Sequence, residues 1–444
     1  MCIRDRLFRG GLRIHTTLDA NLQALAEQAR NELPDTGLLG FDAAIVSLDS
    51  TSGAVRAMVG GRGFIPGERE VNTALSPRQT GSSVKMFILA AAVQAGAQQN
   101  DLLDGTRPCV LPNPGNEEEP FVITDAVSRG VVTLQEHTTR SINCAFARLS
   151  QIVGLNRVVD MIYRMSSSSY LYRDQPRSER LSIEPFASLA TGANELSPLD
   201  MAAGVQTLAN EGVHHDPYFV EFVDDAAGER IYTHLDPGVQ VLDRGAALET
   251  DEILKGPIYG GGTGRRAAFA DRRPAFGKTG TQQDNTNAWF VGGTRQLSTA
   301  VWVGDPNAYT PMRRIPEFVA AGYGSNVQGG HFPAVIWNAF MEPAHIFAPV
   351  LDWDRPPPPE RPNARLYLPG NECIVRIVEV PPPEIDPEAP TTTLAPEVAA
   401  TTTTTLPVVI TEVVPTGTTI PPDVLDPNAP LPSLPATDTL GPCR

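Results

Sequence analysis

The chain has 444 residues, 41% of them hydrophobic, so it is long enough for one large domain or two ordinary ones with buried cores. Its net charge of −16, with no block of basic residues, argues against nucleic-acid binding. No apolar run reaches the ~18 residues of a membrane span. None of the five cysteines lies in a CxxC or Cys/His cluster, so neither a metal site nor a cofactor is expected.

The first part of the chain predicts a helix, a hairpin and a second helix. Residues 11–33 read as a short extended piece followed by a helix, for which Asp19 is a suitable N-cap. The strand-like runs DAAIVSLD and AVRAMVG are joined by STSG, a pattern typical of a β-hairpin. From Ser82 onward, apolar residues recur at helical spacing, and they predict a helix with one apolar face.

The middle of the chain is mixed and mainly helical, and strands return after it. One helix is expected to begin at Thr133, and another over 197–212, with Ser197 as its N-cap. From Phe276 the runs AFGKTGT, NAWFVGGT and LSTAVWVGD predict an antiparallel meander. Residues 332–341 close this part as a helix.

The last fifth of the chain differs in composition. Beyond Val350 lie 21 of the 41 prolines, together with threonine tracts and half of the net negative charge. We expect residues 346–444 to form an extended or disordered acidic tail, with a small hairpin at 365–380. Outside the cytoplasm, Cys373 and Cys443 can pair as a disulfide that closes the tail into a loop.

Only three of the 35 basic residues are lysines: Lys85, Lys255 and Lys278. Arginine stays protonated in proteins, whereas a lysine that is buried or close to another cation can lose its proton and act as a base. Lysines kept in an arginine-rich chain are therefore candidates for chemistry. Lys85 follows Ser82 by three residues in TGSSVKMF, and on a helix this spacing places both side chains on one face.

Two further motifs follow in chain order. RSINCAF contains Ser141-Ile142-Asn143, and GKTGT contains Lys278 at the start of a strand run. Each string alone is a weak signal, because S-x-x-K occurs by chance in most long proteins. The order S-x-x-K, S-x-N, K-T-G is typical of active-site serine enzymes that act on penicillins and on D-alanyl peptides.

The first two motifs supply a nucleophile and its proton acceptors. A serine hydroxyl attacks poorly until a neighbouring base takes its proton, and Lys85 is the candidate base for Ser82. Ser141 is expected to relay a proton to the leaving amine. Asn143 is expected to hold Lys85 and the substrate amide.

The third motif supplies charge and a binding edge. Lys278 provides the second positive charge, which favours a neutral Lys85 and an anionic substrate end. Thr279 and Thr281 are expected to donate hydroxyl hydrogen bonds to the substrate carboxylate, and Gly280 lets a substrate backbone lie close to the strand. Backbone N–H groups of Ser82 and Thr281 are expected to form the oxyanion hole.

Residues 11–345 resemble the transpeptidase half of a class A penicillin-binding protein. Beyond the motifs, GGLRIHTTLD, LSPLDMAAGVQTLANEG, GGGTG, KTGTQQDNTNAWFVGGT, STAVWVG and GGHFPAVIW are similar to further family blocks in the expected order. The resemblance implies an α/β (α+β) penicillin-binding protein/serine β-lactamase-like fold, with an antiparallel sheet flanked by helices and a mainly helical lobe. The chain departs from the family pattern at Thr80, Met86 and Cys144.

The resemblance also implies a domain plan, partners and a location. Residues 1–40 are expected to be a linker left after a missing N-terminal half, and residues 41–345 the penicillin-binding transpeptidase domain. The implied partners are peptidoglycan stem peptides ending in D-Ala-D-Ala, β-lactams and a cell-wall synthesis complex. The implied parent is anchored at the outer face of the cytoplasmic membrane and carries a glycosyltransferase domain.

Three activities compete. The first is D,D-transpeptidation through a Ser82 acyl-enzyme, and the second is hydrolysis by a D,D-carboxypeptidase or β-lactamase. A β-lactamase needs a carboxylate that activates water, and neither Glu184 nor Glu195 lies in a recognisable deacylation motif. The third is a penicillin-sensing module without turnover, against which the complete motif set argues.

Overall fold

The structure, a computed structural model, describes residues 10–67, 69–124, 127–166, 183–323, 325–359 and 361–368, and the backbone of two strands at 373–377 and 411–415. These residues fall into two units, of which the first contains everything described up to Leu366.

In the second unit, β17 (Cys373–Ile377) pairs antiparallel with β18 (Thr411–Pro415). The hairpin expected within residues 365–380 is therefore wrong in its second strand, because the β-branched run that pairs with β17 comes from beyond residue 410. The rest of the predicted tail, including the pairing of Cys373 with Cys443, lies outside the described residues.

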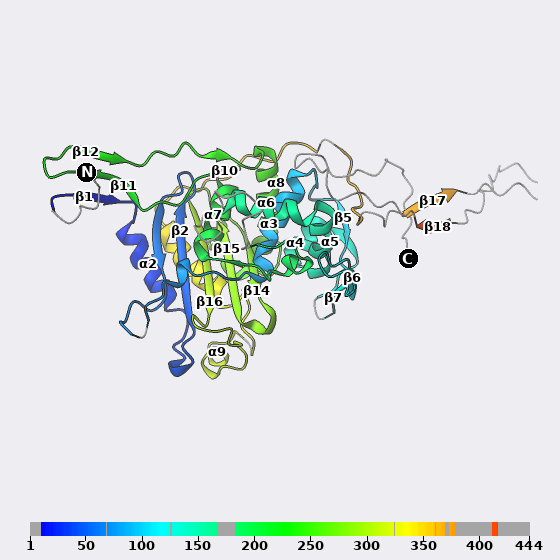
Figure 1. Cartoon of the computed structure of the whole chain (residues 1–444), viewed down its shortest axis with the longest axis horizontal. Coiled ribbons are helices and arrows are strands. Elements are labelled where there is room, and N and C mark those ends of the chain that lie inside the picture. The colour runs from blue at the N-terminus through cyan, green and yellow to red at the C-terminus, as the bar shows by residue number, and fades with distance from the viewer. Residues whose placement is uncertain are drawn as a thin grey trace, which may run out of the picture. The chain divides into compact units, whose positions relative to one another are not determined.

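A five-stranded antiparallel sheet forms the centre of the first unit, in the order β14-β15-β16-β2-β3 (Figure 1). The strands are β2 (Asp42–Asp49), β3 (Val55–Val59), β14 (Phe276–Thr281), β15 (Asn287–Gly293) and β16 (Leu297–Gly304). Both the early hairpin and the late meander are confirmed. They are joined by β16, which pairs with β2 along its whole length.

Helices cover both faces of this sheet. On one face, α2 (Ala20–Arg30) and α10 (Phe332–Ala344) pack against a core that includes Ile45, Phe290 and Trp337. On the other face lies α7 (Pro198–Ala209). A layered arrangement of this kind buries the apolar side chains of both strand faces.

The helix starts follow the expected capping chemistry. Asp19 accepts hydrogen bonds from two backbone N–H groups of the first turn of α2, and Ser197 forms a capping box with Asp200 at the start of α7. Ala26 and Ala29 of α2 are buried in the core. The segment expected to be a linker, residues 1–40, thus contributes a helix to the domain, because the apolar face of α2 covers the sheet.

A helical lobe lies next to edge strand β14. Its centre is α3 (Lys85–Gln94), which contacts α5 (Asn143–Val153), α6 (Leu155–Met165) and α8 (Arg244–Tyr259), and α4 (Leu134–Arg140) packs on α8. Every residue from Lys85 to Val93 is buried, so α3 is apolar on all sides rather than on one, because it is enclosed by helices and sheet.

Smaller elements complete the first unit. One three-stranded sheet has the order β1-β11-β12, and short pairs form between β4 and β9, β5 and β8, β6 and β7, and β10 and β13. Their bounds, with that of helix α9, are β1 (Arg13–Thr16), β4 (Arg78–Gln79), β5 (Leu102–Asp104), β6 (Cys109–Leu111), β7 (Phe121–Ile123), β8 (Val131–Thr133), β9 (Glu195–Leu196), β10 (Val213–His214), β11 (Val220–Asp224), β12 (Arg230–Thr233), β13 (Val239–Gln240) and α9 (Pro316–Ala320). No helix within the described ranges combines the length and apolar character needed to cross a bilayer.

A strap, described at residues 351–359 and 361–366, follows the last helix and belongs to the first unit. Trp353 is 7% exposed, its indole N–H donates to the carbonyl of Ala209, and its ring packs on Phe276. Arg361 forms an ion pair with the fully buried carboxylate of Asp101. The first unit therefore extends past the boundary expected at residue 345, because these two side chains fix a proline-rich segment that composition alone assigns to the tail.

Candidate active site

Ser82 lies in a 3-10 turn, η3 (Gly81–Val84), that continues directly into α3. The turn runs close to β14. A Cβ added to Gly81 would lie 2.5 Å from the carbonyl oxygen of Thr281, and one added to Gly280 would lie 2.4 Å from a carbonyl oxygen at the start of the turn. Gly81 also has φ +52°, so only glycine suits this position well. Ser82 is partly exposed and Lys85 is fully buried, which leaves the hydroxyl accessible and the amine enclosed.

The S-x-N motif connects two helices. Ser141 is the C-cap of α4 and adopts a left-handed backbone conformation with φ 58° and ψ 42°, which is uncommon for serine. Asn143 begins α5 immediately afterwards. The sharp turn directs both residues at Lys85, whose Nζ lies 2.9 Å from the Ser141 carbonyl oxygen and 2.6 Å from Asn143 Oδ1.

Burial, and secondarily the positive charge of Lys278, lower the pKa of Lys85 well below its usual range. A neutral amine has two N–H bonds and one lone pair. The Ser141 carbonyl and Asn143 Oδ1 accept from the two N–H bonds, so the lone pair remains for a proton from a third group. The Ser82 hydroxyl donates to the same Asn143 oxygen at 3.4 Å, so Asn143 Oδ1 contacts both residues, and transfer of the Ser82 proton to Lys85 remains a prediction.

Lys278 lies on β14, and its side chain contacts the S-x-N motif at Ser141. Its Nζ donates to Ser141 Oγ at 2.7 Å and to the Thr279 carbonyl at 3.0 Å. Burial lowers the pKa of Lys278 to about 7. The Ser141 hydroxyl therefore lies between two amines, since Lys85 Nζ is 3.5 Å away on its other side. All three motifs meet at this hydroxyl.

The threonines of the third motif are held by neighbouring loops. Thr279 shares a hydrogen bond of 2.6 Å with Thr263, and Thr281 Oγ1 accepts from the backbone N–H of Gly329 at 3.1 Å. The expectation that Gly280 makes room for a substrate backbone is wrong, because the space where its side chain would lie is occupied by Thr80 and Ser83. This close approach brings the backbone of Thr281 next to the turn that carries Ser82, and the roles of the two threonines toward a substrate remain predictions.

A cleft of about 750 Å³ opens over these groups. Its lining includes Ser82, Ser141, Asn143, Thr279 and Thr281. Sequence reasoning assigned no role to the other lining residues, which include Thr191, Thr263, Gln328, His331, Phe121, Val122, Ile123 and Val127. The strings GGGTG and GGHFPAVIW contain four lining residues, Gly262, Thr263, Gly330 and His331, but a string resemblance does not say which residues face a cleft.

The cleft is basic. Arg140, Arg265, Arg266 and Arg313 line it, and among the described lining residues only Asp284 carries a carboxylate. That carboxylate is paired with Arg313 at 3.0 Å. An excess of fixed positive charge in a partly enclosed cleft attracts anionic ligands.

The two glutamates considered for water activation lie elsewhere. Neither Glu184 nor Glu195 is among the lining residues of the cleft. Glu195 belongs to the short strand β9, and its carboxylate accepts a hydrogen bond from Tyr309. The described part of the cleft therefore has no unpaired carboxylate next to Ser82.

Comparison with known proteins gives a consistent result. The family model for the penicillin binding protein transpeptidase domain matches residues 43–309. Penicillin-binding protein 1A of Mycolicibacterium smegmatis is 30% identical over 363 residues, which cover 78% of this chain and 43% of that protein. Penicillin-binding protein 1A of Aquifex aeolicus is 29% identical over 319 residues, which cover 71% and 40%. The chain thus spans less than half the length of these curated relatives.

Solved structures agree. PonA1 of Mycobacterium tuberculosis superposes with a TM-score of 0.67 at 27% identity, over 80% of this chain and 90% of that one. The same protein in complex with penicillin V gives a TM-score of 0.66 at 28% identity, over 80% and 92%. The fold implied by the sequence resemblance is confirmed.

Proposed function

The chain belongs to the penicillin-binding protein transpeptidase domain family, and on this premise we propose that it is a D,D-transpeptidase that cross-links peptidoglycan stem peptides through an acyl-enzyme on Ser82. The observation that carries the proposal is the meeting of the three motifs at the Ser141 hydroxyl, 2.7 Å from Lys278 and 3.5 Å from Lys85. Penicillins would acylate the same serine.

In the proposed acylation, neutral Lys85 takes the proton of Ser82 Oγ as this oxygen attacks the carbonyl of the penultimate D-alanine. The N–H groups of Ser82 and Thr281 hold the oxyanion of the tetrahedral intermediate. Ser141 passes its proton to the nitrogen of the terminal D-alanine, which leaves as an amine, and protonated Lys85 returns a proton to Ser141. An ester on Ser82 remains.

In the second half of the proposed reaction, an amine of a second stem peptide attacks the ester carbonyl. Its proton returns through the same groups to Ser82 Oγ, and a new amide bond forms. Asn143 orients the peptide amide, and Lys278, Thr279 and Thr281 bind the terminal carboxylate before it leaves. The basic lining of the cleft supports an anionic peptide substrate.

Hydrolysis is the second candidate, and the cleft disfavours its β-lactamase form. Water needs a base to attack the ester, and the single carboxylate among the described lining residues, Asp284, is already paired with Arg313. Deacylation of a penicillin adduct should therefore be slow. A carboxypeptidase side activity would need water to replace the acceptor amine and Lys85 to take the proton of that water.

The family also supports a location and partners. D-Alanyl peptides lie outside the cytoplasmic membrane, so we propose that the domain acts at the outer face of that membrane. A parent protein with an anchor and a glycosyltransferase domain, working within a cell-wall synthesis complex, remains part of the same proposal.

The test is product analysis by mass spectrometry with a donor peptide that ends in D-Ala-D-Ala and a separate amine acceptor. We expect a cross-linked product together with free D-alanine, and neither from the Ser82→Ala variant. A shortened peptide alone would identify a carboxypeptidase instead. Labelling by penicillin without any turnover of peptide would identify a sensing module.

A further inference from the structure

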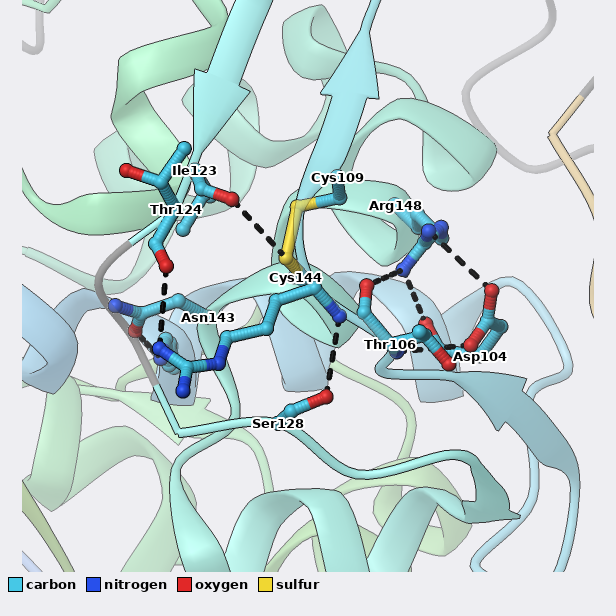
Figure 2. The surroundings of a disulfide bond; sticks show 11 residues. Asp104, Thr106, Cys109, Ile123, Thr124, Ser128, Asn143, Cys144 and Arg148 are labelled. Atoms are coloured by element: carbon cyan, nitrogen blue, oxygen red, sulfur yellow. Dashed lines mark hydrogen bonds and ion pairs between the residues drawn. A yellow bond between two sulfur atoms is a disulfide. The ribbon is translucent and has the colours of Figure 1, made fainter.

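A disulfide bond joins Cys109 to Cys144 beside the proposed site, with 5.8 Å between the two Cα atoms (Figure 2). Cys109 begins β6, and Cys144 is the second residue of α5. Both cysteines are only 1% exposed. The bond is therefore a permanent part of the packing rather than a surface feature open to solvent reductants.

One end of the bond is attached to the S-x-N motif. Cys144 follows Asn143, whose Oδ1 contacts both Lys85 and Ser82. The N-cap residue of α5 is Ile142, which makes no side-chain capping hydrogen bond. The start of this helix thus lacks the usual polar anchor, and the disulfide supplies a covalent one in its place.

The other end is attached to a wall of the cleft. Cys109 lies directly opposite Ile123 in the pairing of β6 with β7. Phe121, Val122 and Ile123 of β7, with Val127 just beyond, are the apolar lining residues of the cleft. The carbonyl oxygen of Ile123 also lies 4.0 Å from the sulfur of Cys144. The bond therefore fixes this hairpin and the S-x-N motif relative to each other.

Two other ties near the disulfide are polar, one partly buried and one exposed, while His137 of α4 makes a buried contact of 2.6 Å with the Leu103 carbonyl. Arg148 of α5 donates to the carbonyl of Asp104 at 2.7 Å and pairs with its carboxylate at 3.3 Å (Figure 2). Arg107 donates to the carbonyl of Thr124 at 3.1 Å in an exposed position. Exposed polar contacts are readily exchanged for water. The disulfide is the covalent tie among these, and water cannot replace it.

We propose that the Cys109–Cys144 disulfide is a positioning element of the acylation site. It holds Asn143 against Lys85 and holds the apolar wall of the cleft against the same motif. The proposal rests on the proposed function, because the effect to be measured is on acylation of Ser82. It also places folding of the domain in an oxidising compartment, where such a bond forms and persists.

Peptide mapping under non-reducing conditions tests the bond itself. A linked pair of peptides that contain Cys109 and Cys144 is expected, and two unlinked peptides would overturn the proposal. The functional test uses the Cys109→Ala/Cys144→Ala double variant in the full chain. Its second-order rate constant for acylation by a fluorescent penicillin should fall roughly tenfold to a hundredfold, since small misplacements of catalytic groups cost this much.

A matched control separates positioning from loss of stability. Ile336→Ala removes a buried side chain from α10, which covers the same face of the sheet as α2. The disulfide and the cleft lining do not include Ile336. With both proteins assayed well below their melting temperatures, the control should acylate at the wild-type rate. A double variant that also does so, with only its melting temperature lowered, would overturn the positioning role.

The pH profile gives a second readout that a purely structural role would not move. Loosening of the motif admits water to Lys85, so the acid limb of the double variant should shift to higher pH. An unchanged profile contradicts the proposal. If the wild-type protein fails to acylate at Ser82, the proposed function fails instead, and the two failures are thereby distinguished.

Discussion

The cleft has two walls that are built differently. The helical wall carries Ser82, Lys85, Ser141 and Asn143 on turns and helix ends from separate parts of the chain. The strand wall is the single strand β14, whose alternation places Thr279 and Thr281 on one face and Lys278, which contacts Ser141, on the other. The helical wall therefore depends on packing between distant parts of the chain. The strand wall depends only on the formation of one strand.

The two walls also have different proposed roles in the reaction. Groups whose proton state must change during the proposed reaction lie on the helical wall, where enclosure lowers the pKa of Lys85. Groups that are proposed to bind the substrate by charge and shape lie on the strand wall. Substitutions that block proton transfer on the helical wall should therefore be more damaging than substitutions that preserve charge on the strand wall.

Loss of the nucleophile should have the largest effect. Ser82→Ala should abolish labelling by a fluorescent penicillin, because Ser82 is the proposed nucleophile and its side chain lines the cleft. Ser83→Ala is the matched control, since Ser83 Oγ donates to the carbonyl of Thr80 instead. An adduct mapped by mass spectrometry to Ser83 or Ser141 would show that Ser82 is not the acylated residue.

Lys85→Arg should come next. Arginine keeps the positive charge but does not accept a proton, so the acylation rate should fall by about 10²- to 10⁴-fold, nearly as far as in Lys85→Ala. Stopped-flow acylation by penicillin measures both variants. An arginine variant that acylates near the wild-type rate would show that Lys85 is not the base.

Lys278→Arg should be milder. Its proposed task is to hold charge beside Ser141 and the substrate carboxylate, and arginine does this with altered geometry. A loss of roughly tenfold corresponds to about 1.4 kcal/mol of transition-state binding. The same stopped-flow assay gives the ranking, and a larger loss than for Lys85→Arg would reverse the assignment of the two walls.

The two walls should also differ in pH dependence. Acylation should fall as pH decreases through the pKa of Lys85, because only its neutral form accepts a proton. It should fall again as pH rises through about 7, the pKa of Lys278, because the strand wall then loses its charge. In Lys278→Arg the alkaline limb should vanish. If the limb persists in the pH–rate profile of that variant, it belongs to another group.

The sequence predicted the strand wall better than the helical one. The strand-like runs within residues 276–304 were sufficient to expect β14 and its neighbours. The ordered motifs named Ser141 and Lys278, but nothing local states that two residues 137 positions apart lie 2.7 Å from each other. The residue in the left-handed conformation is Ser141 rather than a glycine or an asparagine, so the sequence does not predict this conformation.

The disulfide and the strap were missed for related reasons. Five cysteines permit many pairings, and the match of Cys109 with Cys144 depends on the packing of α5 against a hairpin. In the strap, proline and acidic residues predict disorder by composition. The strap is nevertheless ordered, because Trp353 bonds to the carbonyl of Ala209 and Arg361 pairs with the buried Asp101. Both partners lie far away in the chain.

The smallest effect on acylation is expected from removing the strap, which belongs to neither wall. None of the described lining residues of the cleft lies within residues 351–366, so truncation after Val350 should leave the acylation rate within about twofold at temperatures below unfolding. Stability should respond differently. The truncation exposes the pocket of Trp353 and leaves the buried Asp101 carboxylate without Arg361, and losses of this kind cost about 3–5 kcal/mol each.

Thermal unfolding therefore distinguishes the strap from the tail that follows it. The melting temperature should drop clearly on truncation after Val350, whereas truncation after Leu366, the last residue of the strap, should leave it unchanged. Equal melting temperatures for the two truncations would mean that the strap contributes nothing to the domain. A loss of acylation that exceeds the loss of folded protein would mean that the strap supports one of the two walls, most directly through Asp101 and the neighbouring start of α4.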